Sequence, residues 1–307
     1  MNKSLRLLTL PLALSSLALV VNQCNWRKPT ITGFALIPAG SFQMGDQSNP
    51  LAGGSNELPV HPVQVSAFYM AKHLVTKEDW DVVRTWGMTH GYTDLAAGLS
   101  KGKNHPVHAI SWDDIVKWCN ARSQMEGLTA CYLVSGAIYQ TGSSNGVVCN
   151  WSANGYRLPT EAEWEKAARG GLVGQNFPWG NTISHKNANF YNNGDEGFQT
   201  GAKGYDPIYG TGAYPYTSPV GSFTPNGYDL YDMSGNLFEW CWDYWGNYTA
   251  GLQTDPRGPA SGSVRVFRGG SWFSNADDCR VSCRNEFCDP FNADYGFGFR
   301  LARSSAP

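Results

Sequence analysis

The sequence predicts an α+β fold with few helices, short strands and much irregular structure. Its 307 residues include 35 glycines and 13% aromatic residues, a composition that favours a compact, loop-rich chain over a helical bundle. Only three segments combine a capping residue with a following helical pattern, whereas short strand-like runs recur along the chain. Charged residues make up 16% of the chain, below the usual share of about 25%, and the net charge is −2. These values exclude a disordered acidic chain and give no electrostatic footprint for nucleic acid, so no nucleic-acid partner is expected.

The first residues have the composition of a secretion signal. Lys3 and Arg6 precede the uncharged, apolar segment Leu7–Val21, which is shorter than the roughly 20 residues that span a bilayer. Cys24 follows, and in a lipoprotein signal it would become the acylated N-terminus. In an ordinary cleaved secretion signal Cys24 is incidental. Either reading implies export, which permits disulfides.

The N-terminal segment and the remaining sequence together predict a single folded domain behind a signal peptide and a short linker. We predict a signal peptide over residues 1–23, lipidation at Cys24, a linker over residues 24–32 and a single domain over residues 33–307. The protein is then displayed at the outer membrane or cell surface, and its only membrane contact is the lipid anchor. A monomer is expected.

The first half of the domain contains the helices. Residues 34–44 are expected to form two short strands about a Pro-Ala-Gly turn, and residues 63–70 alternate apolar and polar residues as a strand does. Helices are expected from Thr76 to about Trp86, from Ser111 to Arg122 and from Thr160 to Arg169, because each begins with a capping residue followed by acidic residues.

The second half is expected to be irregular with short strands. Residues 177–225 are rich in Gly, Asn, Tyr and Pro and are far longer than an ordinary connection, which indicates a functional or ion-ordered loop. Short strands are then expected within residues 237–242, 264–272 and 298–302. In the first half, Cys131 and Cys149 flank an expected hairpin and are candidate disulfide partners, whereas Cys119 is expected to be buried and free.

Several long motifs resemble the formylglycine-generating-enzyme domain, a variant of the C-type lectin fold. They follow the order of that family and cover nearly all of the mature chain: Ile37–Gly45, Val75–Glu78, Pro106–Trp112, Gly155–Trp164, Phe177–Gly180, Asn226–Trp240, Arg268–Trp272 and Gly298–Leu301. The resemblance implies the C-type lectin fold. It does not settle function, because the family includes oxidases, iron-dependent enzymes and binding proteins without catalysis.

The oxidases of this family carry two cysteines, five residues apart, that bind copper and the substrate thiol. Here Cys279 matches the second cysteine, but Ser274 stands at the first. Soft Cu(I) prefers thiolates over a hydroxyl, so no copper is expected and catalysis is not favoured. The iron-dependent branch needs a histidine cluster, and only His105 and His108 are close in the sequence, where structural roles are favoured.

The family often binds calcium through carbonyl and carboxylate oxygens. Matching its positions implies one calcium site at Asp232, Gly235, Leu237 and Glu239, with the two middle residues acting through their carbonyls. The alternative is that Glu239 is a satisfied buried carboxylate and Asp232 a turn residue. A second, weaker match falls near Asn189, Phe190, Glu196 and Phe198.

Residues 273–297, called the cassette below, have an unusual residue composition that is more informative about function than the metal-site matches. The cassette has no strand or helix periodicity and contains no Lys, Gln, Met or Trp. Apart from Glu286, every residue can be encoded by a codon that ends in a pyrimidine, the set produced when adenines of AAC codons are replaced at random. This resembles the variable region of a target protein of a diversity-generating retroelement, interrupted by residues that stay fixed, such as Arg284 and Pro290. The alternative is a polar loop that lacks four residue types by chance.

We therefore expect a surface-displayed, non-enzymatic protein whose cassette binds a variable protein or cell-surface ligand. Aromatic residues would provide rigid contact area, Ser and Asn adaptable hydrogen bonds, and Asp attraction for cations. The expected ligand-binding residues are Phe273, Ser274, Asn275, Asp277, Asp278, Cys283, Asn285, Phe287, Cys288, Phe291, Asn292, Asp294, Tyr295 and Phe297. Cys283 and Cys288 are either free thiols or a local disulfide, whereas Trp272, Arg300 and Leu301 are expected to be core.

Two other classes of function remain open at this stage. The first is an exported oxidase of the formylglycine-generating type that uses Cys279. The second is a calcium-dependent sugar-binding lectin, which is disfavoured because the usual Glu-Pro-Asn type of sugar motif is absent.

Overall fold

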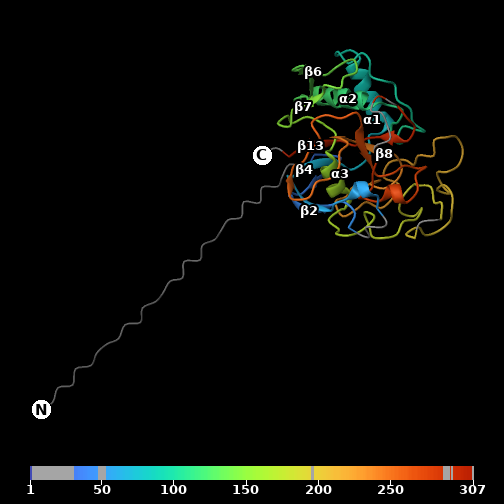
Figure 1. Ribbon diagram of the computed structural model, residues 1–307. Coiled ribbons are helices and arrows are strands. Elements are labelled where there is room, and N and C mark those ends of the chain that lie inside the picture. The colour runs from blue at the N-terminus through green and yellow to red at the C-terminus, as the bar shows by residue number, and fades with distance from the viewer. Residues whose placement is uncertain (2–30, 48–52, 195–196, 286–290, 292, 306–307) are drawn as a thin grey trace.

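The computed structural model describes residue 1 and residues 31–47, 53–194, 197–285, 291 and 293–305. Within these ranges the fold is α+β, as predicted, with three α-helices and four small sheets joined by long irregular segments. Figure 1 shows the first two helices together at one end of the molecule, with strand β8 between them and the third helix. No helix of the described part is long and apolar enough to cross a membrane.

The three helices are α1 (Lys77–Gly87), α2 (Trp112–Met125) and α3 (Glu161–Ala168). Each begins at the predicted cap, because Thr76, Ser111 or Thr160 accepts a hydrogen bond from the backbone N–H three residues later. The acidic side chain at that later residue returns a bond to the cap, which completes a capping box. Local sequence alone therefore determines all three helix starts.

The strands are short and pair across large separations in the sequence. One sheet has the order β1 (Phe34–Ile37), β4 (Phe68–Ala71), β13 (Ala302–Ser304), and a second has the order β2 (Gly40–Met44), β3 (His61–Val65), β9 (Gln253–Thr254). A third has the order β6 (Ala137–Ile138), β5 (Tyr132–Val134), β7 (Val148–Cys149). The fourth, which carries the cassette, has the order β11 (Arg284–Asn285), β10 (Arg265–Arg268), β8 (Phe238–Tyr244), β12 (Phe297–Gly298).

Two strand predictions are corrected by the structure. Residues 63–70 do not form one strand, because the chain passes from β3 to β4, in a different sheet, at Ser66. The N–H and hydroxyl of Ser66 both donate to the carboxylate of Asp255, at 2.7 Å each. Likewise, residues 298–302 are divided between β12 and β13, which belong to different sheets.

The predicted pairing of Cys131 with Cys149 is also wrong, since both are free thiols, as is the buried Cys119. The register explains the difference. Cys149 lies directly opposite Tyr132, so Cys131 is outside the paired positions of this small sheet.

Tryptophan side chains fill the core. Trp80 of α1 and Trp118 of α2 stack with ring centroids 5.6 Å apart, and Phe299 packs edge-on against both. Trp164 of α3 lies in a second cluster against the sheets. Trp272, Arg300 and Leu301 are buried, as predicted.

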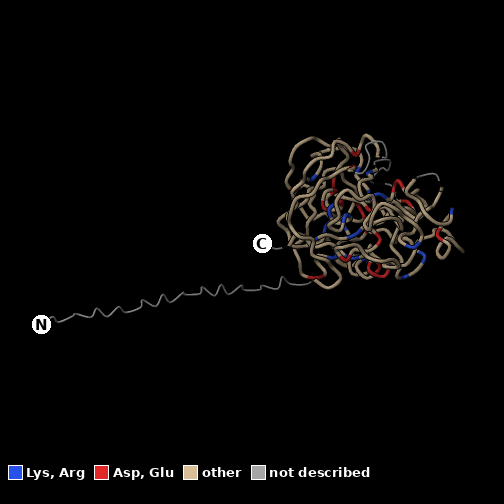
Figure 2. The backbone as a smooth tube through the Cα atoms, turned by 90° about the horizontal axis from the view of Figure 1, so that it is seen from below, with Lys and Arg blue, Asp and Glu red and all other residues tan. Residues whose placement is uncertain are grey.

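Buried ion pairs cross-link the irregular segments. Figure 2 shows several Lys and Arg positions beside Asp and Glu positions in the middle of the tube. Arg157 pairs with Glu163, Arg268 with Glu165, Arg280 with Glu57, Arg284 with Glu161, and Arg300 with Glu239. The chain, although low in overall charge, therefore contains a set of matched interior charges, and all of these pairs except Arg157–Glu163 join residues more than 60 positions apart.

Candidate ligand-binding site

Strand β10 leads directly into the cassette through two glycines in the left-handed region. Gly269 and Gly270 have φ values of +93° and +72°. A Cβ at Gly270 would lie 2.5 Å from the sulfur of Cys279, so only glycine fits there. The cassette returns to the same sheet at β12, which pairs in parallel with β8. Both ends of the cassette are thus fixed to one rigid sheet.

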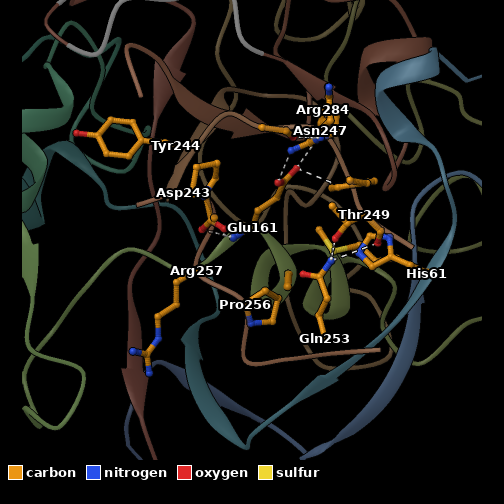
Figure 3. Close-up of a pocket in the computed structure, with 16 residues that line it drawn as sticks. His61, Glu161, Asp243, Tyr244, Asn247, Thr249, Gln253, Pro256, Arg257 and Arg284 are labelled. Atoms are coloured by element: carbon orange, nitrogen blue, oxygen red, sulfur yellow. Dashed lines mark hydrogen bonds and ion pairs between the residues drawn. The ribbon is translucent and has the colours of Figure 1, made fainter. Parts of the chain in front are cut away.

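Two arginines anchor the cassette to the scaffold. The guanidinium of Arg280 donates to both oxygens of Glu57, at 2.6 and 2.8 Å. Arg284 donates to both oxygens of Glu161, at 2.7 Å each, as Figure 3 shows. All four side chains are buried, so these arginines hold the cassette in place and are not available to a ligand.

Between the two ends of the cassette lies an open cavity of about 410 Å³, called the cassette pocket below. Its floor consists of Phe238, Phe267 and Phe297, whose ring centroids are 4.8 to 5.5 Å apart. The remaining residues that line the pocket all belong to the cassette: Phe273, Ser274, Asn275, Asp278, Asn285 and Asp294. A volume of this size suits one large side chain or a small molecule.

Three predicted contact residues are exposed at the surface. Phe273, Phe291 and Tyr295 have exposed fractions of 40%, 42% and 47%. Exposed aromatic side chains are typical of binding surfaces. The structure therefore confirms that Phe291 and Tyr295 are not part of the core.

The polar residues predicted to bind a ligand fall into two groups, one exposed or half-buried and one buried. Asp294 is exposed, whereas Asn275, Asp277 and Asp278 are half-buried. Asp277 accepts from Arg280 at 2.7 Å, so part of its charge is used within the cassette. Ser274 and Asn285 are buried but line the pocket, and are reached only from inside it.

Two predicted contacts are corrected by burial. Phe297 is 6% exposed and packs into the core, so it forms the floor of the pocket rather than an exposed contact. Cys283 is also 6% exposed and does not line the pocket. Burial raises the pKa of the Cys283 thiol, which keeps it protonated and unreactive. Phe287, Cys288 and Asn292 lie outside the described residues, as does Glu286.

Aromatic residues of the long 177–225 segment extend the exposed surface, which sequence reasoning missed. Tyr214 is 61% exposed and lies edge-on to Trp272, with centroids 4.7 Å apart, and 6.1 Å from Tyr295. Tyr205, 40% exposed, lies 5.8 Å from Trp272. We call Tyr205, Tyr214, Phe273 and Tyr295 the aromatic ledge. The Tyr-rich composition of a long polar segment was the available signal.

Comparison with known proteins identifies the family to which this fold belongs. A model of the sulfatase-modifying factor enzyme 1-like domain matches residues 21–305. The chain belongs to this family. The formylglycine-generating enzyme of Mus musculus is 33% identical over 299 residues, which cover 92% of this chain and 77% of that protein. The chaperone protein LppX of Paenibacillus barcinonensis is 34% identical over 258 residues, covering 79% of this chain and 82% of that protein.

Among solved structures, Treponema denticola variable protein 1 superposes with a TM-score of 0.67 at 31% sequence identity. The alignment covers 88% of this chain and 94% of that chain. The resemblance inferred from the motifs and the C-type lectin fold of this family are thereby confirmed. Because proteins with such different names share the family, membership does not by itself decide between enzyme and binding protein.

The positions at which the family's oxidases carry two cysteines are unfavourable for that chemistry here. The Ser274 hydroxyl lies 3.0 Å from that of Ser271. Cys279 is wholly buried in an apolar cluster with Phe177, Ile183 and Phe190, and it does not line the cassette pocket. A thiol so enclosed is out of reach of a substrate in that pocket.

The residues matching the family's calcium site lie beside Arg300. Glu239 accepts from Arg300 through both oxygens and from the indole N–H of Trp164 at 2.8 Å. Asp232 is buried with φ +55°, one oxygen accepts from Gly221 at 2.8 Å, and the other, Oδ1, has no hydrogen-bond partner. Burial raises the pKa of Asp232 to about 6, and the charge of Glu239 adds to that effect.

The carboxylates of Asp232 and Glu239 offer the oxygen ligands that a calcium ion prefers. Asp232 Oδ1 is an orphaned buried acceptor, and Glu239 Oε1 accepts only one bond, so each can offer a lone pair. No group of three His, Cys, Asp or Glu side chains suited to a metal occurs among the described residues. The remaining ligands would be the Gly235 and Leu237 carbonyls. Of the second match, Glu196 lies outside the described residues, and the Asn189 amide donates to the carbonyl of Tyr216.

His105 and His108 have structural surroundings. His105 Nδ1 lies 3.0 Å from the hydroxyl of Thr217. His108 is buried beneath Tyr295, with centroids 5.6 Å apart, and neither of its ring nitrogens has a partner. Burial lowers the pKa of His108 to about 4, although Asp294 opposes the shift, so this ring is neutral at physiological pH.

A second cavity of about 290 Å³, the scaffold pocket, shares no lining residue with the cassette pocket. Figure 3 shows Glu161, Asp243 and Arg284 meeting at its wall, while Arg257 turns away from them and stacks on Trp151 at 4.3 Å. Asp243 accepts from the backbone N–H of Glu161 at 2.8 Å. Burial, with the charge of Glu161, raises the pKa of Asp243 to about 8.

Proposed function

We propose that this protein is a surface-displayed, non-enzymatic ligand-binding protein whose specificity lies in the cassette. The observation that carries the proposal is the open aromatic cassette pocket, which Ser274 lines and Cys279 does not. Ser274 replaces one cysteine of the pair that the family's oxidases carry, and Cys279 is enclosed in the core. Exposed aromatic side chains on a rigid frame are the physical basis of a paratope.

We propose further that a diversity-generating retroelement varies the cassette. The division of the cassette supports this, because Arg280 and Arg284 are buried anchors whereas Phe273, Phe291 and Tyr295 are exposed. Mutagenesis confined to adenine-containing codons would change the exposed positions and leave the anchors intact.

Sequencing this locus across isolates tests the diversification directly. We expect substitutions to be concentrated at exposed and pocket-lining cassette positions, and a near-identical template repeat beside a reverse transcriptase gene. Substitutions spread evenly along the gene would contradict the proposal.

Binding itself is tested with a library in which the exposed cassette positions are randomised and displayed on the intact scaffold. We expect selection to yield variants that bind different protein targets. The matched library randomises exposed positions of α1, such as Asp81 and Val82, and should yield none.

We propose that the chain is exported and anchored through a lipid on Cys24. The apolar Leu7–Val21 segment supports export. Metabolic labelling with a palmitate analogue should mark the wild type and not Cys24→Ala, whose mature form should be released from membranes.

The relatives named formylglycine-generating enzyme support an alternative function, an exported oxidase that uses Cys279. Titration with Cu(I), followed by a cysteine-containing peptide, distinguishes the two. We expect neither stoichiometric copper binding nor turnover, and detection of both would replace the binding proposal with the enzymatic one.

We propose a calcium ion at Asp232 and Glu239, supported by the orphaned oxygen of Asp232. The Arg300 guanidinium already balances one carboxylate, so we expect weak affinity. Calcium should raise the melting temperature of the wild type but not of Asp232→Asn, and magnesium should act more weakly because it demands a stricter geometry. An equal calcium effect on both chains would exclude this site.

A further inference from the structure

Half of the aromatic ledge comes from outside the cassette. Phe273 and Tyr295 belong to the cassette, whereas Tyr205 and Tyr214 belong to the 177–225 segment, and we call these last two the scaffold tyrosines. Tyr214 is 61% exposed, more than either ring of the cassette. Diversification confined to the cassette would leave the scaffold tyrosines the same in every copy of the protein. The ledge then combines two variable positions with two constant ones.

The variable and the constant rings of the ledge rest on one buried side chain, that of Trp272. The centroid of the Trp272 ring is 5.0 Å from Phe273 of the cassette. It is 4.7 Å from Tyr214 and 5.8 Å from Tyr205. The fourth ring, Tyr295, lies 6.1 Å from Tyr214. The scaffold tyrosines are therefore direct neighbours of the cassette rings at the surface.

Backbone hydrogen bonds attach the segment of the scaffold tyrosines to the cassette. The N–H of Tyr191 donates to the carbonyl of Ser274, at 2.9 Å. Asn192 and Gly204 exchange two backbone hydrogen bonds of 2.8 Å each, and Tyr205 follows directly. A ring that stands on bonded backbone loses little conformational freedom when a ligand binds.

The turn that leads from Tyr205 toward the second scaffold tyrosine is also cross-linked. The buried carboxylate of Asp206 accepts from the backbone N–H groups of Ile208 and Tyr209, at 2.8 and 3.1 Å. The ammonium group of Lys101 donates to the carbonyls of Tyr209 and Thr211, at 3.2 Å each. The exposed rings of this segment are thus presented by a fixed backbone.

The position of the scaffold tyrosines indicates the size of the ligand. The described lining of the cassette pocket includes Phe273 but neither Tyr205 nor Tyr214. A ligand that contacts both the pocket and the scaffold tyrosines must therefore extend across the surface outside the pocket, as a protein does. Tyrosine is also enriched among the few residues that dominate binding between proteins.

Covering Trp272 is the structural role that these rings could have instead. Tyr216 fits that role, because it is half-buried and its ring centroid lies 5.3 Å from that of Trp272. Tyr214 differs, since more than half of its surface remains exposed although it contacts the same ring. Exposed aromatic surface that the fold does not use favours a binding role.

We propose that the scaffold tyrosines, Tyr205 and Tyr214, are constant contacts that hold a protein ligand against whichever cassette the protein carries. The proposal rests on the proposed binding function and deepens it. The cassette selects the ligand, and the scaffold tyrosines add affinity for every ligand selected.

The test uses the cassette library on the full mature chain, selected against two unrelated probe proteins, lysozyme and ubiquitin. Tyr214→Ala is introduced into several binders of each probe, and dissociation constants are measured by surface plasmon resonance. We expect binding about tenfold weaker in every binder, whatever its cassette, and about threefold weaker for the less exposed Tyr205→Ala. Leu252→Ala, which alters a similarly exposed side chain (66%) beside β9, is the matched control and should have no effect.

Hydroxyl-radical footprinting by mass spectrometry tests the same contact without a substitution. We expect the Tyr214 side chain to be oxidised more slowly in the complexes with both probes than in the free protein, and Leu252 to be oxidised equally in both. This measurement decides the question even where Tyr214→Ala lowers the melting temperature.

The outcomes separate this proposal from the binding function. If binders are obtained but Tyr214→Ala weakens only those of one probe, or Tyr214 is oxidised equally in the free and bound protein, the constant contact is overturned and the binding function stands. If the library yields no binder of either probe, both fail.

Discussion

The scaffold pocket and the cassette pocket differ in the charged side chains that line them. In the scaffold pocket the Glu161 carboxylate is matched by two hydrogen bonds from Arg284, and Asp243 is held near neutrality by its raised pKa. The described residues that line the cassette pocket include Asp278 and Asp294 and neither Lys nor Arg. The matched interior charge of the scaffold pocket fixes the backbone there. The arginine that stabilises the first pocket also holds the cassette over the second.

The largest effect should come from breaking the matched pair. Glu161→Gln leaves Arg284 buried without a counter-charge, and we expect a loss of about 3 to 5 kcal/mol in the free energy of unfolding. Urea denaturation measures this. The exposed Glu78, 3.9 Å from Lys103, provides the control, and Glu78→Gln should cost less than about 1 kcal/mol. Equal costs would mean that the scaffold pair does not anchor the cassette.

The floor and rim of the cassette pocket should differ almost as strongly. Phe297→Ala removes a buried ring and should cost about 3 kcal/mol, near the lower end for such changes because part of the ring faces the cavity. Tyr295→Ala should cost less than about 0.5 kcal/mol and should instead reduce ligand binding, since that ring is exposed. A stability loss for Tyr295→Ala as large as for Phe297→Ala would mean that the Tyr295 ring is part of the core.

The pH dependence of stability should report the neutral carboxyl group of the scaffold pocket. Because the folded-state pKa of Asp243 is about 8 and its ordinary value is 3.8, the folded chain retains a proton that the unfolded chain loses over this interval. The contribution to stability is therefore full below about pH 4 and is lost as the pH rises through about 8.

Thermal and urea unfolding from pH 6 to 8 measure that loss. The free energy of unfolding should fall by about 2 kcal/mol more in the wild type than in Asp243→Asn, which has no proton to lose. Parallel curves would show that Asp243 is ionised in the folded chain.

The smallest effect on stability is expected from His108, which lies beneath the exposed ring of Tyr295. The pKa of His108 is lowered to about 4 from the ordinary 6.5, so its stabilising contribution is present above about pH 6.5 and is lost as the pH falls toward 4. His108→Gln should reduce the loss of stability on acidification over this range. Circular dichroism melts at pH 7 and 5 test this, and an unchanged difference would exclude the assignment.

The sequence by itself determined the features that depend on neighbouring residues. The capping boxes of the three helices, the burial of Trp272 and Arg300, the family, and the unusual composition of the cassette could all be read from short motifs. These succeed because capping bonds and family motifs involve residues a few positions apart, or a fixed set of scaffold positions.

Only the tertiary structure decided which cassette residues face a ligand. The cassette has no periodicity, so sequence could not separate the exposed Tyr295 from the buried Phe297 two residues later. Nor could it place Tyr214 beside the cassette, or pair Arg280 with Glu57 and Arg284 with Glu161 across more than a hundred residues. In irregular backbone, burial is set by contacts distant in sequence, and it is these contacts that divide the cassette into buried anchors, pocket floor and exposed rim.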